Sequence, residues 1–153
     1  MDAAGDLYIA ADGRIRKVSS GGVISTVAGS GPAWSAPPPT APTSGDGGPA
    51  TSAPLRAPFA VALDADGNVY ISGGQLSGFF NGVGYVRKIT SDGNIATIAG
   101  NGVSGYSGEI PATSASFGAA TAGIAVGVGG TIYVADVFNN VIRALRYQPV
   151  RSN

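Results

Sequence analysis

The chain has 153 residues, a mass of 15.0 kDa and nine acidic residues balanced by nine basic ones. The absence of a basic excess disfavours nucleic-acid binding, and without Cys or His the chain has no disulfide, no zinc-thiolate site and neither the commonest metal ligand nor the commonest general base. No apolar run reaches the roughly 18 residues of a membrane span, and the first residues show no signal peptide. Hydrophobic residues make up 44% of the chain, so a core can form, and we expect one domain over 1–153.

Short strand patterns follow one another along the chain. β-Branched and aromatic residues bounded by turn residues predict strands near 7–10, 15–18, 23–27, 59–63, 68–72, 85–89, 94–99, 123–126, 132–135 and 141–145. No window carries apolar residues at helical spacing with caps, so we expect almost no helix. The sequence therefore predicts an all-β fold.

The strand patterns repeat. Tyr8, Tyr70 and Tyr133 stand in three similar segments, 62 and 63 residues apart. The segment GGVISTVAGSG (21–31) is likewise matched by DGNIATIAGNG (92–102). Four short antiparallel strands per unit are the blade pattern of a β-propeller. With strands lettered A to D outward from the axis, the chain runs B-C-D, A-B-C-D, A-B-C. The expected blades are about 2–29, 57–100 and 122–147, joined by long connectors at 30–56 and 101–121.

Several of these motifs together resemble the NHL-repeat β-propellers of bacteria. The motifs are GNVYI, IRK, VISTVAG, SGDGGPATSA and AVALD, and the family's Asp, Asn and Ile pattern is best kept at Asp136, Asn139 and Ile142. The resemblance implies a propeller, commonly six-bladed, that usually offers a binding surface. Some members of the family are lyases or lactonase-like hydrolases with a metal in the central channel. The resemblance also implies an extracellular or periplasmic location.

The number of blades bears on assembly. At about 62 residues per blade, 153 residues supply about two and a half blades. A propeller removes its sheet edges by closing the ring, so a partial one exposes edges and apolar faces. We expect a partial propeller completed by oligomerisation, with a homodimer favoured over a trimer or a strand-swapped assembly, unless the chain is an excerpt of a longer propeller.

Arg16, Arg87 and Arg143 occupy one equivalent position in the three repeats. They could line one face and bind a carboxylate or a sugar acid. The alternative, which we favour, is a structural hydrogen bond repeated in each blade, or a solvated strand face.

Two irregular loops carry aromatic residues. Trp34 lies in the Pro-rich stretch GPAWSAPPPTAPT (31–43), and Phe79 and Phe80 lie in a second loop. A stiff loop with exposed aromatic side chains is a candidate platform for a glycan or a peptide. Alternatively, these residues cover blade or subunit edges.

Two further loops resemble ligand sites only in part. The DADGN turn (64–68) begins like a calcium loop but has Gly67 and Gln75 at the wrong positions, so a structural turn is favoured. The SGDGGPA loop (44–50) could cradle an anion, but it lacks the Lys of a phosphate loop, and no helix is predicted after it. We expect no metal and no cofactor.

The favoured function is a non-catalytic interaction module that presents propeller loops to a protein or glycan. There is no GxSxG motif, and a Ser nucleophile would need Lys17 or Lys88 as its base. The alternative is a hydrolase or lyase with a carboxylate-lined channel, in which Asn139 and Asn140 would be the nearest polar candidates. No catalytic residue is assigned, and no nucleic-acid or membrane partner is expected.

Overall fold

The computed structural model describes residues 1–31, 44–75, 82–119 and 121–146. In these residues the chain forms ten strands and four three-residue 3-10 helices. The strands are β1 (Leu7–Ala11), β2 (Arg14–Val18), β3 (Ile24–Ala28), β4 (Pro58–Leu63), β5 (Val69–Gln75), β6 (Val83–Ile89), β7 (Ile95–Ala99), β8 (Thr121–Val126), β9 (Ile132–Asp136) and β10 (Val141–Leu145). The helices are η1 (Ala50–Ser52), η2 (Ala112–Ser114), η3 (Val128–Gly130) and η4 (Val137–Asn139). The all-β prediction is confirmed, and no described helix is long and apolar enough to cross a membrane.

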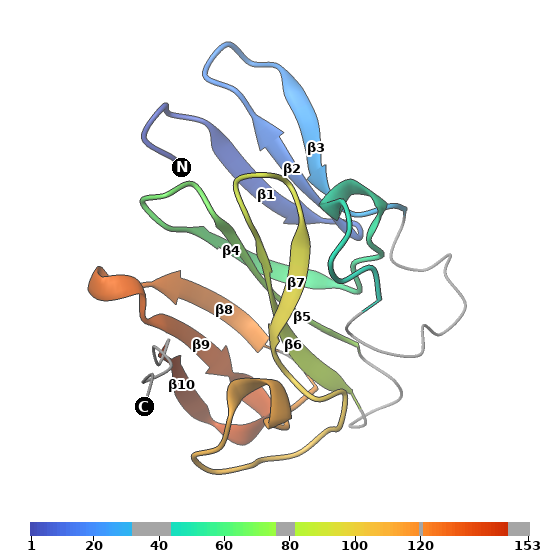
Figure 1. Ribbon diagram of the computed structural model, residues 1–153, viewed down its shortest axis with the longest axis vertical. Helices are drawn as coiled ribbons and strands as arrows, with labels where there is room; N and C mark the ends of the chain where they lie inside the picture. The colour runs from blue at the N-terminus through green and yellow to red at the C-terminus, as the bar shows by residue number, and fades with distance from the viewer. Residues whose placement is uncertain (32–43, 76–81, 120, 147–153) are drawn as a thin grey trace, which may run out of the picture.

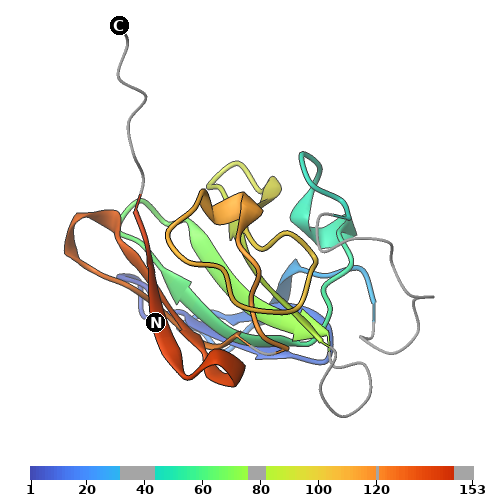
Figure 2. The same ribbon diagram turned by 90° about the horizontal axis from the view of Figure 1, so that it is seen from below.

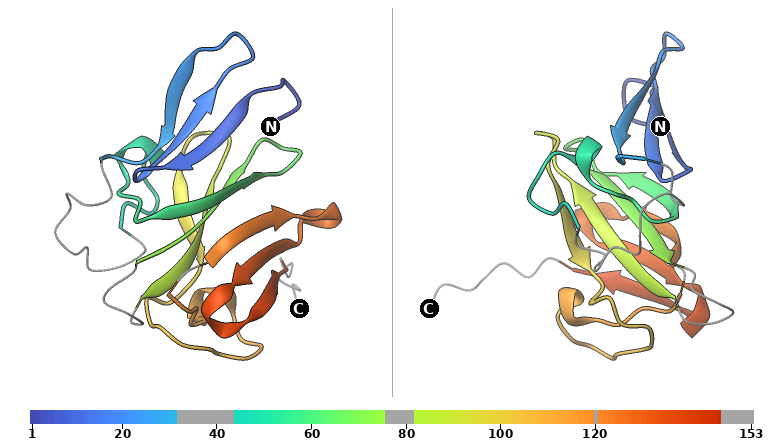
Figure 3. Two further views of the ribbon diagram at one scale, coloured as in Figure 1. Left: turned by 180° about the vertical axis from the view of Figure 1, so that it is seen from behind. Right: turned by 90° about the vertical axis from the view of Figure 1, so that its right-hand side faces the viewer.

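The strands form three antiparallel sheets in chain order, β1-β2-β3, β4-β5-β6-β7 and β8-β9-β10. Figure 1 shows the sheets fanned one beside the next, from the blue first sheet through the green second sheet to the red third sheet. The view from behind in Figure 3 shows the same order. The predicted arrangement of three, four and three strands is confirmed for the described residues, and the sheets lie as the blades of a partial propeller.

Tight turns set the register of the hairpins. Asp12 and Gly13 both have positive φ, 49° and 70°, which fits the two-residue turn that joins β1 to β2. The hairpin of β5 and β6 is longer than predicted, because glycines at its end allow it to pack closely against the backbone near Gly118. A Cβ on Gly84 would lie 2.8 Å from the carbonyl oxygen of Gly118.

Each pair of neighbouring sheets encloses one apolar cluster. Because side chains alternate along a strand, β5 turns Val69 and Ile71 toward the first sheet and Tyr70 toward the third. The first cluster comprises Ile15, Ala28, Ala50, Ala53, Leu55, Val69, Ile71, Ile89 and Ile95. The second comprises Tyr70, Val86, Ala99, Ala115, Phe117, Ile132 and Val134. The second sheet is therefore covered on both faces, and the first and third sheets on one face each.

The described parts of the two connectors complete these interfaces. Residues 44–57 contribute Ala53 and Leu55 to the first cluster, and residues 101–119 contribute Ala115 and Phe117 to the second. Figure 2 shows both segments on the same side of the stacked sheets. The SGDGGPA loop ends in the single 3-10 turn η1, and no longer helix follows it among the described residues.

Candidate functional site

The DADGN turn is organised by the Asp64 carboxylate. Its Oδ1 accepts the backbone N–H groups of Asp66 and Asn68 at 3.0 and 2.8 Å, and its Oδ2 accepts the Asn68 amide and the Tyr70 hydroxyl at 2.7 and 2.9 Å. Burial opposes ionisation of Asp64, but these hydrogen bonds outweigh it, so its pKa lies below the ordinary value. Burial and then the Asp64 carboxylate raise the pKa of Tyr70 to about 12. Four donors from the chain itself thus bond to the Asp64 carboxylate, which organises the turn.

The first repeat builds the same turn on Asp2, whose Oδ1 accepts the backbone N–H groups of Ala4 and Asp6 at 3.0 and 2.9 Å. Lys17 Nζ lies 2.6 Å from Asp6 Oδ2. The hydrogen bond with Lys17 lowers the pKa of Asp6, and the same bond raises the pKa of Lys17. Lys17 therefore has carboxylate partners in the turn that precedes β1.

Arg87 on β6 fastens the first connector to the second sheet. Its side chain is 1% exposed. Nη1 donates to the carbonyl of Pro54 at 3.2 Å, and Nη2 donates to the carbonyl of Ser44 at 2.9 Å. Nη2 also forms an ion pair with Asp46 Oδ1 at 2.5 Å. The guanidinium fork thereby bonds both ends of residues 44–54 and the carboxylate between them.

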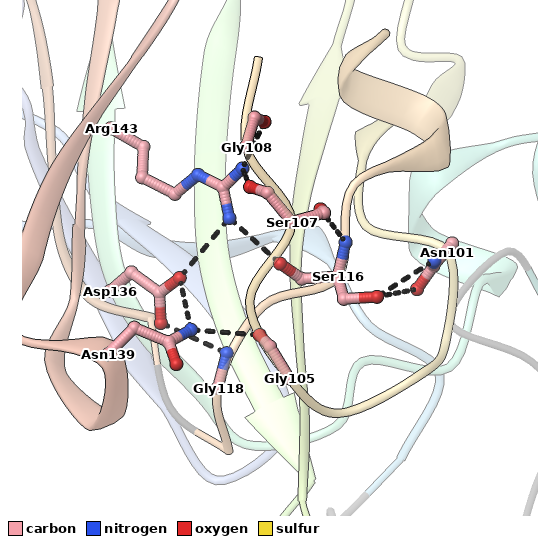
Figure 4. A network of polar contacts seen from close by, with 9 residues as sticks. All are labelled: Asn101, Gly105, Ser107, Gly108, Ser116, Gly118, Asp136, Asn139 and Arg143. Carbon is pink, nitrogen blue, oxygen red and sulfur yellow. Dashed lines mark hydrogen bonds and ion pairs between the residues drawn. The ribbon is translucent and has the colours of Figure 1, made fainter. Parts of the chain in front are cut away.

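Arg143 on β10 does the same for the second connector (Figure 4). Nη1 donates to the carbonyl of Ser116 at 2.8 Å, and Nη2 donates to that of Ser107 at 2.7 Å. The guanidinium also lies 4.7 Å from the centroid of the Phe117 ring and 3.5 Å from Asp136 Oδ2. Arg87 and Arg143 are thus structural clamps with partners inside the chain.

Asp136 and Asn139 belong to the same network in Figure 4. Asp136 is fully buried, and its Oδ1 accepts the Gly118 N–H at 3.0 Å. The Asn139 amide donates to Asp136 Oδ2 and to the carbonyl of Gly105, both at 2.9 Å. These polar groups hold the second connector against the third sheet.

Arg16 on β2 holds the equivalent position in the first sheet but has far fewer partners. Its Nη1 donates to the hydroxyl of Thr26 at 3.0 Å, which is its one hydrogen bond to the described residues. Its Nε is buried without a partner there. Of the three arginines, the structure thus leaves only Arg16 without a bound segment among the residues it describes.

The outer faces of the first and third sheets expose apolar side chains whose equivalents are buried inside the stack. Leu7 is 46% exposed, whereas Val69 at the equivalent position of the second sheet is 4% exposed. Ile142 is 69% exposed, whereas its equivalent Val86 is completely buried. Leu7, Ile9 and Ile24 form what we call the N-face, and Tyr133, Ala135 and Ile142 form the C-face. An open apolar hollow lies on the C-face, lined by Gly123, Ile124, Ala125, Tyr133, Ala135 and Ile142.

The sequence predicted exposed terminal faces but assigned none of these residues to them. Aligning the three repeats position by position would have identified them, because the internal repeat shows which positions an adjoining blade covers. Trp34, Phe79 and Phe80 lie outside the described residues, so their predicted platform stays a prediction. Within the described ranges no three carboxylate side chains gather into a group that could hold a metal ion.

Compared with protein-family models and with curated proteins, the chain matches none. The candidate site therefore rests on the chain's own geometry, which offers two apolar end faces and, at Arg16, an arginine that holds no connector segment among the described residues.

Proposed function

We propose that the chain is a non-catalytic interaction module whose end faces bind other propeller blades, in the first place those of a second copy. The observation that carries this proposal is the equivalence between the exposed end faces and the buried inner interfaces. Inside the stack, Tyr8 and Ile15 of one sheet pack on Val69 and Ile71 of the next. An NHL-type propeller ring, which the motifs suggest, is built from repeats of this contact.

The two end faces are the two halves of that contact. The C-face presents Tyr133 and Ile142 where the first sheet presents Tyr8 and Ile15. The N-face presents Leu7 and Ile9 where the second sheet presents Val69 and Ile71. The C-face of one copy therefore fits the N-face of another, in a head-to-tail contact that uses different surfaces on the two partners.

Repeated head-to-tail contacts form a closed ring when the rotations from each blade to the next add up to one full turn. Propellers have about four to eight blades, and two copies with three blades each give six. We therefore propose a homodimer with two identical contacts. Each would remove exposed apolar side chains from water, which is the main driving force for association.

Analytical ultracentrifugation tests the proposal. The expected species is about 30 kDa, twice the 15.0 kDa of the chain. Ile142→Asp should produce a folded monomer. Ile142 is already exposed in the single chain, so the charge of the substituted aspartate would be buried only in the dimer. Val128→Asp is the matched control, since Val128 is fully exposed in the turn after β8 and belongs to neither face.

Mixing two monomeric variants tests the head-to-tail geometry. Leu7→Asp disables the N-face and Ile142→Asp disables the C-face, so each variant alone should be a monomer. Mixed together they should form a heterodimer, because one intact N-face then meets one intact C-face. A wild-type monomer at tens of micromolar, or a mixture that stays monomeric, would overturn the proposal.

A further inference from the structure

The second sheet contains a built carboxylate site. Arg87 on β6 and Thr97 on β7 are register partners beside a β-bulge. Asp46 of the connector lies between them: Arg87 Nη2 is 2.5 Å from its Oδ1, and the Thr97 N–H donates to its Oδ2 at 2.9 Å. The Thr97 hydroxyl adds a bond to Oδ1 at 3.2 Å. Arginine, threonine and backbone together hold one carboxylate of a glycine-rich segment.

The first sheet repeats this site without the carboxylate. Arg16 on β2 and Thr26 on β3 are register partners beside a bulge at the same place. Here the guanidinium turns to the threonine itself, with Arg16 Nη1 at 3.0 Å from Thr26 Oγ1. The Nε atoms of Arg16 and Arg87 are both buried without a partner among the described residues, so the two sites differ in what their Nη atoms bond. The first sheet thus has an arginine and a threonine equivalent to those that bind Asp46, and within the described part of the chain these two side chains bond each other.

The backbone beside the site repeats as well. In the second sheet the Ile95 N–H donates to the carbonyl of Gly48 at 3.0 Å, and the Ile95 carbonyl accepts the Gly47 N–H at 2.8 Å. Ile24 holds the same register on β3, opposite Val18 as Ile95 is opposite Ile89. No described segment pairs with the outer edge of β3 at Ile24, and its side chain is 54% exposed.

We propose that the Arg16–Thr26 site binds a glycine-rich polypeptide segment that carries one carboxylate, with the chemistry of residues 44–55. The carboxylate would bond Arg16 and Thr26 as Asp46 bonds Arg87 and Thr97. The glycines after it would pair with the edge of β3 at Ile24 as Gly47 and Gly48 pair with Ile95, and the positive φ of Gly47, 81°, favours glycine there. An apolar residue at the end of the segment, like Leu55, would then cover Ile9 of the N-face. This proposal does not depend on self-association, because a second copy needs its own residues 44–55 for its own Arg87.

The test grafts the ligand onto the chain. A copy of residues 44–63 is placed directly before Asp2, so that the copied Leu63 precedes Asp2 as Leu63 precedes Asp64 in the native chain. Because Asp2 and Asp64 organise the same turn, the copied segment enters the first sheet in the native register. We expect the graft to raise the melting temperature by several degrees over the ungrafted chain.

A double-mutant cycle isolates the proposed contact from the added strand. Its arms are Arg16→Met and the Asp→Asn change at the copied position 46, both in the grafted chain. We expect the two groups to be coupled by about tenfold in the unfolding equilibrium constant. All four proteins also carry Ile142→Asp, so the result is independent of whether the wild type self-associates.

Additive effects of the two changes, or a graft that destabilises the chain, would overturn the proposal. A titration in trans gives a second readout. The synthetic peptide of residues 44–55 should shift the amide NMR signals of Thr26 and Ile24, and the same peptide with Asn at position 46 should shift them much less. Equal shifts with both peptides would show that no carboxylate is recognised.

Discussion

Replacing Arg87 with methionine tests whether this arginine is a clamp, because the change removes the guanidinium and keeps most of the apolar stem. It leaves Asp46, which is 28% exposed, and the carbonyls of Ser44 and Pro54 without their donor. Breaking one side of a buried ion pair costs about 3–5 kcal/mol. Because Asp46 keeps its bonds to Thr97 and partial access to water, we expect a loss of about 2–4 kcal/mol in the free energy of unfolding.

The matched control is Arg16→Met at the equivalent position of the first sheet. Arg16 has one hydrogen bond to the described residues, to Thr26, so its loss should cost about 1 kcal/mol or less. For a chain of this size the difference between the two variants corresponds to about 4–8 °C in melting temperature. Arg87→Lys should recover only part of the loss, because a lysine cannot bond two carbonyls and a carboxylate with one planar fork.

Thermal melts and urea titrations, followed by circular dichroism at one protein concentration, measure these differences. Equal losses for Arg87→Met and Arg16→Met would refute the assignment of Arg87 as a connector clamp. A fully restored stability in Arg87→Lys would show that the charge alone matters and that the fork geometry does not.

The remaining predictions concern pH. The folded-state pKa of Asp64 is lowered, so its contribution to stability is present above the unfolded value of about 4 and is lost as the pH falls further. Asp64→Asn should flatten the fall in stability below pH 5 in acid titrations, and an unchanged acid limb would contradict this. Burial raises the pKa of Tyr85, whose hydroxyl donates to the carbonyl of Arg56 at 2.5 Å. Its contribution is therefore present below the unfolded value of about 10 and is lost in stronger alkali, so Tyr85→Phe should weaken the alkaline dependence of the melting temperature.

Much of the fold was predictable because the signals that specify it are local. The alternation of β-branched residues and the turn at Asp64–Asn68 depend on neighbours a few residues away, and such local patterns predicted ten strands in three sheets. The repeat spacing of the tyrosines predicted the grouping of those strands into blades. The sequence also placed Arg16, Arg87 and Arg143 at one equivalent position.

The tertiary structure decided what those equivalent arginines contact. Arg87 and Asp46 are 41 residues apart, and their pairing depends on how the connector folds back between two sheets. No local pattern distinguishes Arg87, which is buried under a connector, from Arg16, which lies in the same register without one. The same holds for Ile71 and Ile9, since strand periodicity shows that both face one side of a sheet but only packing shows which side is covered. The sequence by itself determined the blades and their order, and the stacking of those blades determined which faces remain available for a partner.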